Sequence, residues 1–250
     1  MSPRPTGAGV LAVVVLVALA ATGWYAARPG QLRPVADQDL GLGTVVQAAP
    51  RSAPQQSSPV PAQTRRADAA WAQRIAMQAG IPVTAMQAYG TATLRLSQEQ
   101  PGCKLGWTTL AGIGWIESQH GTMGDRALGA DGRSVPPVIG PALDGQAFAA
   151  IPSTPEGVRL HGDPDWDHAM GPMQFITSTW TTWATDGDSD GSADPYDIDD
   201  AALAAGRYLC ASGRDLSTAS GWSAAIFSYN HSDDYVRSVY AAAESYAART

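Results

Sequence analysis

The hydrophobic and polar positions divide the chain into three parts. Apolar residues are dense over residues 10–21, whereas Pro, Ala, Gln and Ser dominate a stretch without periodicity at residues 29–66. From about residue 67 onward, apolar residues recur at the spacing of amphipathic helices. We therefore expect an apolar N-terminal segment at residues 1–28, a disordered linker at residues 29–66 and one folded domain at residues 67–250.

Start and stop signals indicate several helices in the folded part. The expected helices follow Asp68, run from Thr108 to His120, follow Ser178, run from Asp199 to Cys210, and follow Ser232. Residues 122–170 have scattered Gly, Pro and Asp and show no alternating strand pattern. The domain is therefore predicted to be mainly α with long loops.

The N-terminal segment indicates export. Val10–Ala21 has the length and composition of a signal-peptide core. If it extends to Ala27, it approaches the roughly 20 residues that span a bilayer, with Trp24 and Tyr25 suited to the outer interface. The segment is therefore a signal sequence or a membrane anchor. We expect an extracytoplasmic protein of the cell envelope, anchored to the cytoplasmic membrane or secreted.

Charge is distributed unevenly along the chain. Residues 1–66 carry six arginines and two aspartates, which leaves 10 basic and 21 acidic groups for residues 67–250. A domain this acidic repels a phosphate backbone, so nucleic-acid binding is disfavoured.

Cys103 and Cys210 are the two cysteines of the chain. In an exported protein an even pair favours a disulfide, with two buried free thiols as the alternative. A metal site lacks ligands, because no histidine is nearby in the sequence.

Glu117 is the first candidate for chemistry. On a helix it continues an apolar stripe through Leu110 and Ile113, which directs its carboxyl group to the interior or a cleft. Desolvation there raises a carboxyl pKa, as a glycosidase general acid requires. The alternative is a glutamate that turns to solvent at the helix end or pairs with Arg126.

Two further motifs suit a ligand site. A Gly171-Pro172 turn allows close backbone approach, and Gln174 offers amide groups to sugar hydroxyls. Near the last helix, Tyr229 is placed to hydrogen-bond a carboxylate and Asn230 to orient substrate or chain. Each alone is an ordinary turn or a core aromatic residue.

In this order the motifs resemble the lytic murein transglycosylase B type of SLT domain, in its actinobacterial form. The resemblance covers most of residues 68–245. It rests on four pieces of sequence, namely Glu117-Ser118, Gly171–Phe175 with the following Ser-Thr-Trp, the run from Asp194 to Ala202, and Tyr229–Ser232 with Tyr235-Val236. It implies a lysozyme-like fold and peptidoglycan glycan strands as the partner. It also implies a catalytic Glu117, with Gln174 and Tyr229 near the cleft. Together with Ser118 and Asn230, these two are the substrate-binding candidates.

The mechanism that the resemblance implies uses one carboxyl group. Glu117 protonates the bond between N-acetylmuramic acid and N-acetylglucosamine, the substrate's N-acetyl group assists, and a 1,6-anhydro end is left. Such chemistry belongs with the substrate-assisted exceptions to two-carboxylate glycosidases. A muramidase on the same fold, with a second carboxylate from among Asp125, Asp131 and Asp144, stays an alternative. A non-catalytic peptidoglycan-binding domain and a calcium-gated adhesion module are the others.

Residues 186–197 match the pattern of an EF-hand calcium loop. Aspartates stand at positions 1, 3, 5 and 9, glycine at position 6, and aspartate replaces the usual glutamate at position 12. We expect a structural calcium ion; the alternative is an acidic surface turn. The expected ligands are Asp186, Asp188, Asp190, Ser192, Asp194 and Asp197.

Overall fold

The computed structural model describes residues 66–146 and 148–250. The predicted signal sequence or anchor and nearly all of the predicted linker lie outside these residues, so both stay predictions. Within the described part of the chain, no helix is long and apolar enough to cross a membrane.

The described chain is mainly helical, as the sequence predicts, with two small antiparallel sheets. Strand β1 pairs with β2, and β3 pairs with β4 through an irregular register. The helices are α1 (Ala69–Ala79), α2 (Val83–Glu99), α3 (Trp107–Ser118), α4 (Pro155–His161), α5 (Thr177–Trp183), α6 (Ile198–Cys210), α7 (Ala219–Tyr229) and α8 (Asp233–Ala247). The strands are β1 (Ala127–Leu128), β2 (Ser134–Val135), β3 (Ile139–Ala142) and β4 (His168–Met170).

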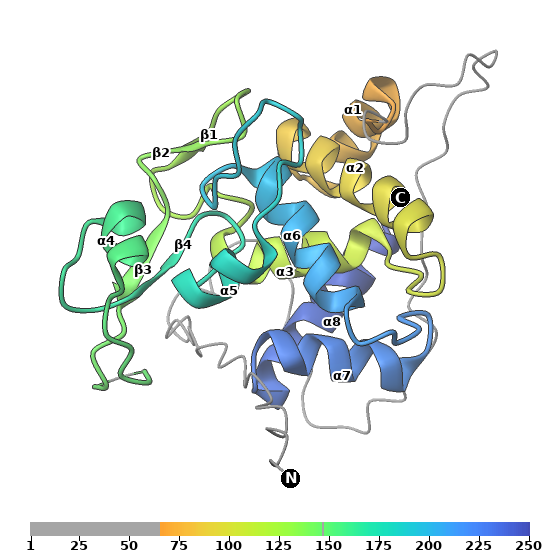
Figure 1. The fold of residues 1–250 in the computed structure, drawn as a ribbon. Coiled ribbons are helices and arrows are strands. Elements are labelled where there is room, and N and C mark those ends of the chain that lie inside the picture. Colours follow the sequence, from red (N-terminus) through yellow and green to blue (C-terminus); the bar gives the residue numbers. More distant parts are fainter. Residues whose placement is uncertain (1–65, 147) are drawn as a thin grey trace, which may run out of the picture.

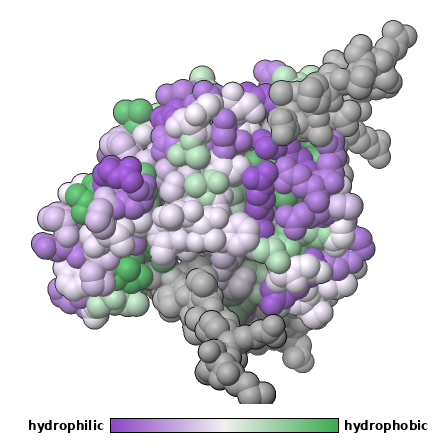
Figure 2. All heavy atoms as spheres, in the orientation of Figure 1, coloured by the Kyte–Doolittle hydropathy of each residue, from purple (hydrophilic) through white to green (hydrophobic). Residues whose placement is uncertain are grey.

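Helix α3 lies at the centre of the fold and packs against α2, α6 and α8 (Figure 1). Both sheets and the short helices α4 and α5 gather on one side of this helical body (Figure 1). On the face drawn in Figure 2, hydrophobic side chains form only small, scattered patches. The apolar residues are instead concentrated in one main core that joins all the long helices.

The sequence of α3 explains its central position. Small residues alternate with large apolar ones, and its residues are buried on every side except at Trp115 and Ile116, which are half-buried. A helix that is apolar all round belongs in the interior. The apolar stripe predicted for Glu117 is therefore part of a helix that is buried around most of its circumference.

Two predicted N-terminal helix caps are confirmed, and one is wrong. The side chains of Asp68 and Ser232 accept the backbone N–H of Trp71 and Tyr235, as capping residues do. Ser178, however, lies inside α5 and does not cap it. The N–H of Thr177 at the start of α5 is bound instead by the Asp167 carboxylate at 3.2 Å, a partner ten residues away.

The largest errors concern the middle of the chain and the end of α3. Residues 122–170 contain short strands and α4, which the sequence pattern did not indicate, and α2 and α7 were also not predicted. Helix α3 ends at Ser118, two residues before the predicted end. Gln119 and His120 both have positive φ angles, 53° and 61°, which an α-helix does not allow.

The predicted disulfide is confirmed. Cys103 and Cys210 are bonded, with their Cα atoms 5.4 Å apart. The bond joins the loop before α3 to the last residue of α6, and both cysteines are buried in the main core. The cross-link therefore fixes the helix that follows the acidic loop relative to the helix that carries Glu117.

Candidate active site

Glu117 lies in the last turn of α3 and is only 8% exposed. Burial raises its pKa and a hydrogen bond from Tyr235 lowers it in part, which leaves the pKa at about 8. Arg126, the alternative ion partner, donates instead to the carbonyl oxygens of Met123 and Pro137. The carboxyl group is thus held neutral at neutral pH, ready to donate a proton.

The hydroxyl group that contacts Glu117 belongs to Tyr235, in the first turn of α8. It donates to Oε1 of Glu117 at 2.5 Å. The Tyr235 ring stacks on that of Tyr229, with centroids 6.5 Å apart and planes inclined by 5°. Tyr229 itself donates to the carbonyl oxygen of Met173 at 2.7 Å, so the predicted bond from Tyr229 to a carboxylate is wrong.

Tyr235 was missed as a site residue because its position on the last helix suggested a core contact. The sequence places Tyr235 three residues after the capping Ser232, which locates it in the first turn of α8 but does not indicate its partner. There the first turn of α8 starts beside the end of α7, and the contact with Glu117 spans 118 positions of sequence. No local pattern encodes such a contact.

The turn from Gly171 to Gln174 lies against the end of α3, next to Glu117. Gly171 has φ of 70°, and a Cβ atom there would lie 1.7 Å from the carbonyl oxygen of Pro195, so only glycine fits. Ser118 donates to the carbonyl oxygen of Pro172 at 2.6 Å. Together with the Tyr229 bond described above, this ties the turn to the ends of α3 and α7.

The predicted substrate residues therefore have different surroundings. Ser118 is fully buried, and its hydroxyl also accepts the N–H of Gly121 at 2.7 Å, so it positions the turn. Gln174 is 9% exposed, and its amide nitrogen donates to the carbonyl oxygen of Gly171 at 2.9 Å. Asn230 is 2% exposed, and its Oδ1 has no hydrogen-bond partner among the described residues.

A small, mainly apolar pocket adjoins the turn on the side of Tyr229. It lies between α5, α6 and α7, and its lining residues are Gln174, Phe175, Ile176, Thr179, Tyr208 and Tyr229. The pocket shares Gln174 and Tyr229 with the candidate site, and Glu117 is not among its lining residues.

His120 fixes the backbone just beyond Glu117. It is buried, with Nδ1 3.0 Å from the Tyr89 hydroxyl and Nε2 2.9 Å from the Tyr246 hydroxyl. Burial lowers its pKa to about 3, so the ring is neutral and plays a structural part. The sequence indicated His120 only as a helix end, because both of its partners are distant in sequence.

Two of the three carboxylates proposed for a two-carboxylate mechanism have hydrogen-bond partners in their own loops. Asp131 accepts the backbone N–H of Arg133, and Asp144 accepts from the backbone and side chain of Gln146. These two carboxylates are therefore engaged within their own loops.

The acidic loop between α5 and α6 brings together part of its predicted ligand set. Carboxylate oxygens of Asp186, Asp188 and Asp190 lie within 4.8 Å of one another. Asp186 accepts backbone N–H groups from Ser189, Asp190 and Gly191, which curls the loop around it. Clustered carboxylate oxygens of this kind suit a hard cation such as calcium.

Asp194 and Asp197, two other predicted ligands, face Arg133. Their distances to its guanidinium nitrogens are 3.1 Å and 3.2 Å. Asp197 also caps α6 by accepting the N–H of Asp199. Neither is part of the cluster of Asp186, Asp188 and Asp190.

Asp199 and Asp200, at the start of α6, lie beside the acidic loop but were not among the predicted site residues. Burial and neighbouring aspartates raise the pKa of Asp199 to about 6 and that of Asp200 to about 7. Among the described residues, Oδ1 of Asp199 is buried without a hydrogen-bond partner, and Asp200 accepts the N–H groups of Gly187 and Asp194. A bound cation offsets such crowding of negative charge, so the loop fits one.

Comparison with known proteins bears on the same region. Residues 162–223 match the family model of the transglycosylase SLT domain. No curated protein and no solved structure matches the chain.

The match to the SLT domain covers about a quarter of the chain. It contains the Gly171–Gln174 turn, the acidic loop and α6, whereas Glu117 and Tyr235 lie outside it. Together with the helical architecture, it confirms the predicted mainly α, lysozyme-like fold. The match supports transglycosylase activity on peptidoglycan in general terms.

Proposed function

We propose that the described domain is a peptidoglycan lytic transglycosylase with Glu117 as its single acid and base. The observation that carries this proposal is a buried carboxyl group with a pKa of about 8, hydrogen-bonded by Tyr235. It lies beside the turn at the start of a segment that matches the transglycosylase SLT domain.

The proposed reaction balances with one proton carrier. Glu117 gives its proton to the glycosidic oxygen between N-acetylmuramic acid and N-acetylglucosamine, and the C1–oxygen bond breaks. The muramoyl N-acetyl group stabilises C1 from within the substrate, as in other substrate-assisted reactions. The Glu117 carboxylate then takes the proton of the C6 hydroxyl, whose oxygen bonds to C1. A 1,6-anhydro end forms, and no water is consumed.

The surroundings of Glu117 suit both of its roles. Burial favours the neutral acid before the first step. The Tyr235 hydroxyl favours the carboxylate that exists between the steps. Burial and the single Tyr235 donor thus have opposite effects on the Glu117 carboxyl group, so it can act first as acid and then as base near neutral pH.

The acidic loop provides a second proposal, on the metal. We propose that it holds a structural calcium ion, with Asp186, Asp188 and Asp190 as ligands. The ion supplies positive charge that balances the buried acids at the start of α6, among them Asp199 and Asp200. Its role is to order the loop, since no part of the proposed reaction requires it.

The proposed place of action follows from the substrate. Peptidoglycan lies outside the cytoplasmic membrane, so the domain acts in the cell envelope. An N-terminal anchor followed by a linker at residues 29–66 gives the domain reach into the wall.

The decisive experiment is mass spectrometry of soluble products from purified peptidoglycan. Residues 66–250 are compared with the same protein carrying Glu117→Gln, which is expected to lose at least about 10²-fold in rate. Anhydro-muropeptides from the wild type alone support the proposal. Reducing-end products identify a muramidase instead. A folded wild type that sediments with the wall but releases nothing identifies a binding domain.

A further inference from the structure

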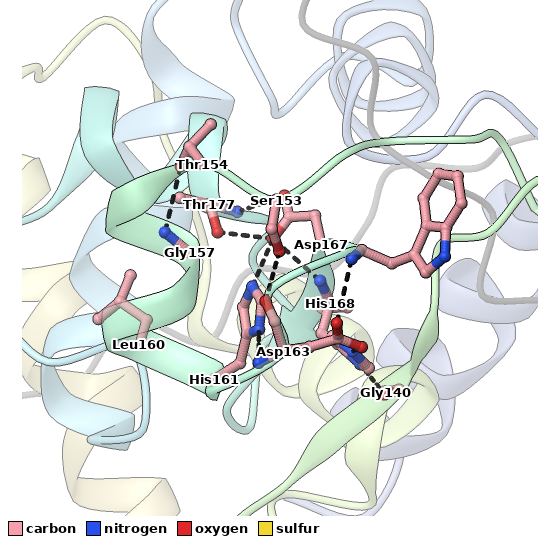
Figure 3. A network of polar contacts seen from close by, with 12 residues as sticks. Gly140, Ser153, Thr154, Gly157, Leu160, His161, Asp163, Asp167, His168 and Thr177 are labelled. Carbon is pink, nitrogen blue, oxygen red and sulfur yellow. Dashed lines mark hydrogen bonds and ion pairs between the residues drawn. The ribbon is translucent and has the colours of Figure 1, made fainter.

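Two histidines and two aspartates form a polar network that the proposed reaction does not use. His161 ends α4, His168 begins β4, and Asp163 and Asp167 lie in the connection between them. Figure 3 shows the two histidine rings side by side, with centroids 4.9 Å apart. Asp167 is 3% exposed, so the network is partly an interior one.

Counting donors and acceptors shows that His161 is neutral. Its Nδ1 accepts the backbone N–H of Asp163 at 3.2 Å, so this nitrogen carries no proton. Its Nε2 therefore carries the proton and donates to Oδ1 of Asp167 at 3.1 Å. Asp167 also accepts from the hydroxyl and the N–H of Thr177, which fixes the start of α5.

The same count gives a different result for His168. Its Nδ1 lies 2.7 Å from the carbonyl oxygen of Gly140, and its Nε2 lies 3.0 Å from Oδ2 of Asp163. Both partners are acceptors, so each ring nitrogen must carry a proton, and the ring is an imidazolium. Independently of His168, the backbone N–H groups of Asp165 and Trp166 donate to Oδ1 of Asp163 and favour its carboxylate form, which accepts and cannot donate.

The charges around His168 agree with an imidazolium. The carboxylate of Asp163 accepts from its ring, and that of Asp167 accepts its backbone N–H at 2.9 Å. On α4, Glu156 and Arg159 pair with each other, and the remaining titratable group is the neutral ring of His161. Strand β3 and helix α5, which also pack against β4, contain no titratable residue.

The Gly140 carbonyl group links this network to the candidate site. A Cβ atom at Gly140 would lie 2.9 Å from Oε1 of Gln174, so the β3 backbone is in close contact with the Gln174 amide. Next to it, the N–H of Gly171 donates to the carbonyl oxygen of Val138 at 2.8 Å. Strand β3 therefore supports the turn, and the His168 ring contacts β3 at the carbonyl oxygen of Gly140.

We propose that His168 is a positioning residue, which bridges Asp163 and Gly140 as an imidazolium and so holds β3 against Gln174. The charge state and the support of β3 follow from geometry alone. The effect on catalysis rests on the proposed function. Loss of the proton at Nε2 leaves two acceptors facing each other and loosens the hold on β3.

The charge state is tested by NMR of the ¹⁵N-labelled domain, which needs no variant. Imidazole ¹⁵N shifts distinguish protonated from unprotonated ring nitrogens. At about pH 6.5, where a free histidine is half protonated, His168 is expected to show two protonated nitrogens and His161 one. An unprotonated nitrogen on His168 overturns the proposal.

The support of β3 is tested by amide hydrogen exchange with three variants. His168→Gln and Asp163→Asn are expected to speed exchange at the Gly171 amide by roughly 10-fold, since one hydrogen bond of about 1.4 kcal/mol is lost. Asp165→Asn is the matched control, because Asp165 is exposed in the same loop and undergoes the same charge change. Unchanged exchange in both test variants overturns the proposal.

Kinetics then connect the network with the reaction. In His168→Gln, KM for glycan strands is expected to rise by roughly 3- to 10-fold, and kcat to stay within about twofold. A fall in kcat with unchanged KM contradicts a positioning role. If the wild type releases no product at all, the proposed function fails, but the NMR and exchange results still decide the structural part.

Discussion

The hydroxyl of Tyr235 provides the sharpest test of how the site controls its acid. Tyr235→Phe removes one oxygen atom from a side chain that is 7% exposed and stacked on Tyr229. The ring can keep its place, because a phenyl group has the same shape as the phenol ring. The change therefore isolates the hydrogen bond to Oε1 of Glu117, which is 2.5 Å long.

The size of the effect follows from this bond. A hydrogen bond to a charged group contributes roughly 1.5–3 kcal/mol, and 1.36 kcal/mol corresponds to one pKa unit. The bond lowers the pKa of Glu117, which is about 8 with the bond in place. Its removal is therefore expected to raise this pKa by about one unit or more. The Glu117 carboxylate, needed in the second step, becomes about 10- to 100-fold harder to form.

The assay is the pH dependence of product release from purified peptidoglycan. The general acid must be protonated, so wild-type kcat/KM is expected to fall as pH rises through about 8. In Tyr235→Phe this limb moves to higher pH, and kcat at neutral pH falls. Tyr240→Phe, on the same helix with a half-buried ring against Trp222, is the control. An alkaline limb that stays in place refutes the assigned role of the hydroxyl.

Three further predictions concern stability. Because the folded-state pKa of Glu117 is raised from 4.5 to about 8, the wild type loses stability as pH rises across that interval. Glu117→Gln is therefore expected to be more stable than the wild type by about 3 kcal/mol at pH 7 in thermal unfolding, with no difference near pH 4. Replacing Cys103 and Cys210 by alanine removes a cross-link over 107 residues and is expected to cost up to about 4.7 kcal/mol, measured by urea unfolding; a loss below about 1 kcal/mol contradicts this. Calcium is expected to raise the melting temperature, and EGTA to lower it, by about 2–4 °C for each kcal/mol of binding free energy. Asp188→Asn should reduce this shift. A wild-type melting temperature that changes with neither reagent contradicts the calcium site.

Local sequence signals predicted the parts that depend on neighbouring residues. The caps at Asp68 and Ser232 are confirmed, because a cap binds N–H groups two or three residues away. The burial of Glu117 was expected from helical spacing. Of the six calcium ligands predicted in residues 186–197, the structure brings Asp186, Asp188 and Asp190 together. The disulfide was expected from two cysteines in an exported chain and is confirmed.

Only the tertiary structure decided which distant groups meet. Tyr235, not Tyr229, reaches Glu117, since the packing of α8 against α3 sets that contact. Asp167, not Ser178, binds the N–H at the start of α5, because β4, which begins directly after Asp167, packs against α5. The imidazolium of His168 depends on Gly140, 28 positions away. Helical periodicity extends over a few residues, whereas the hydrogen-bond partner and pKa of a buried group depend on whatever the fold places against it.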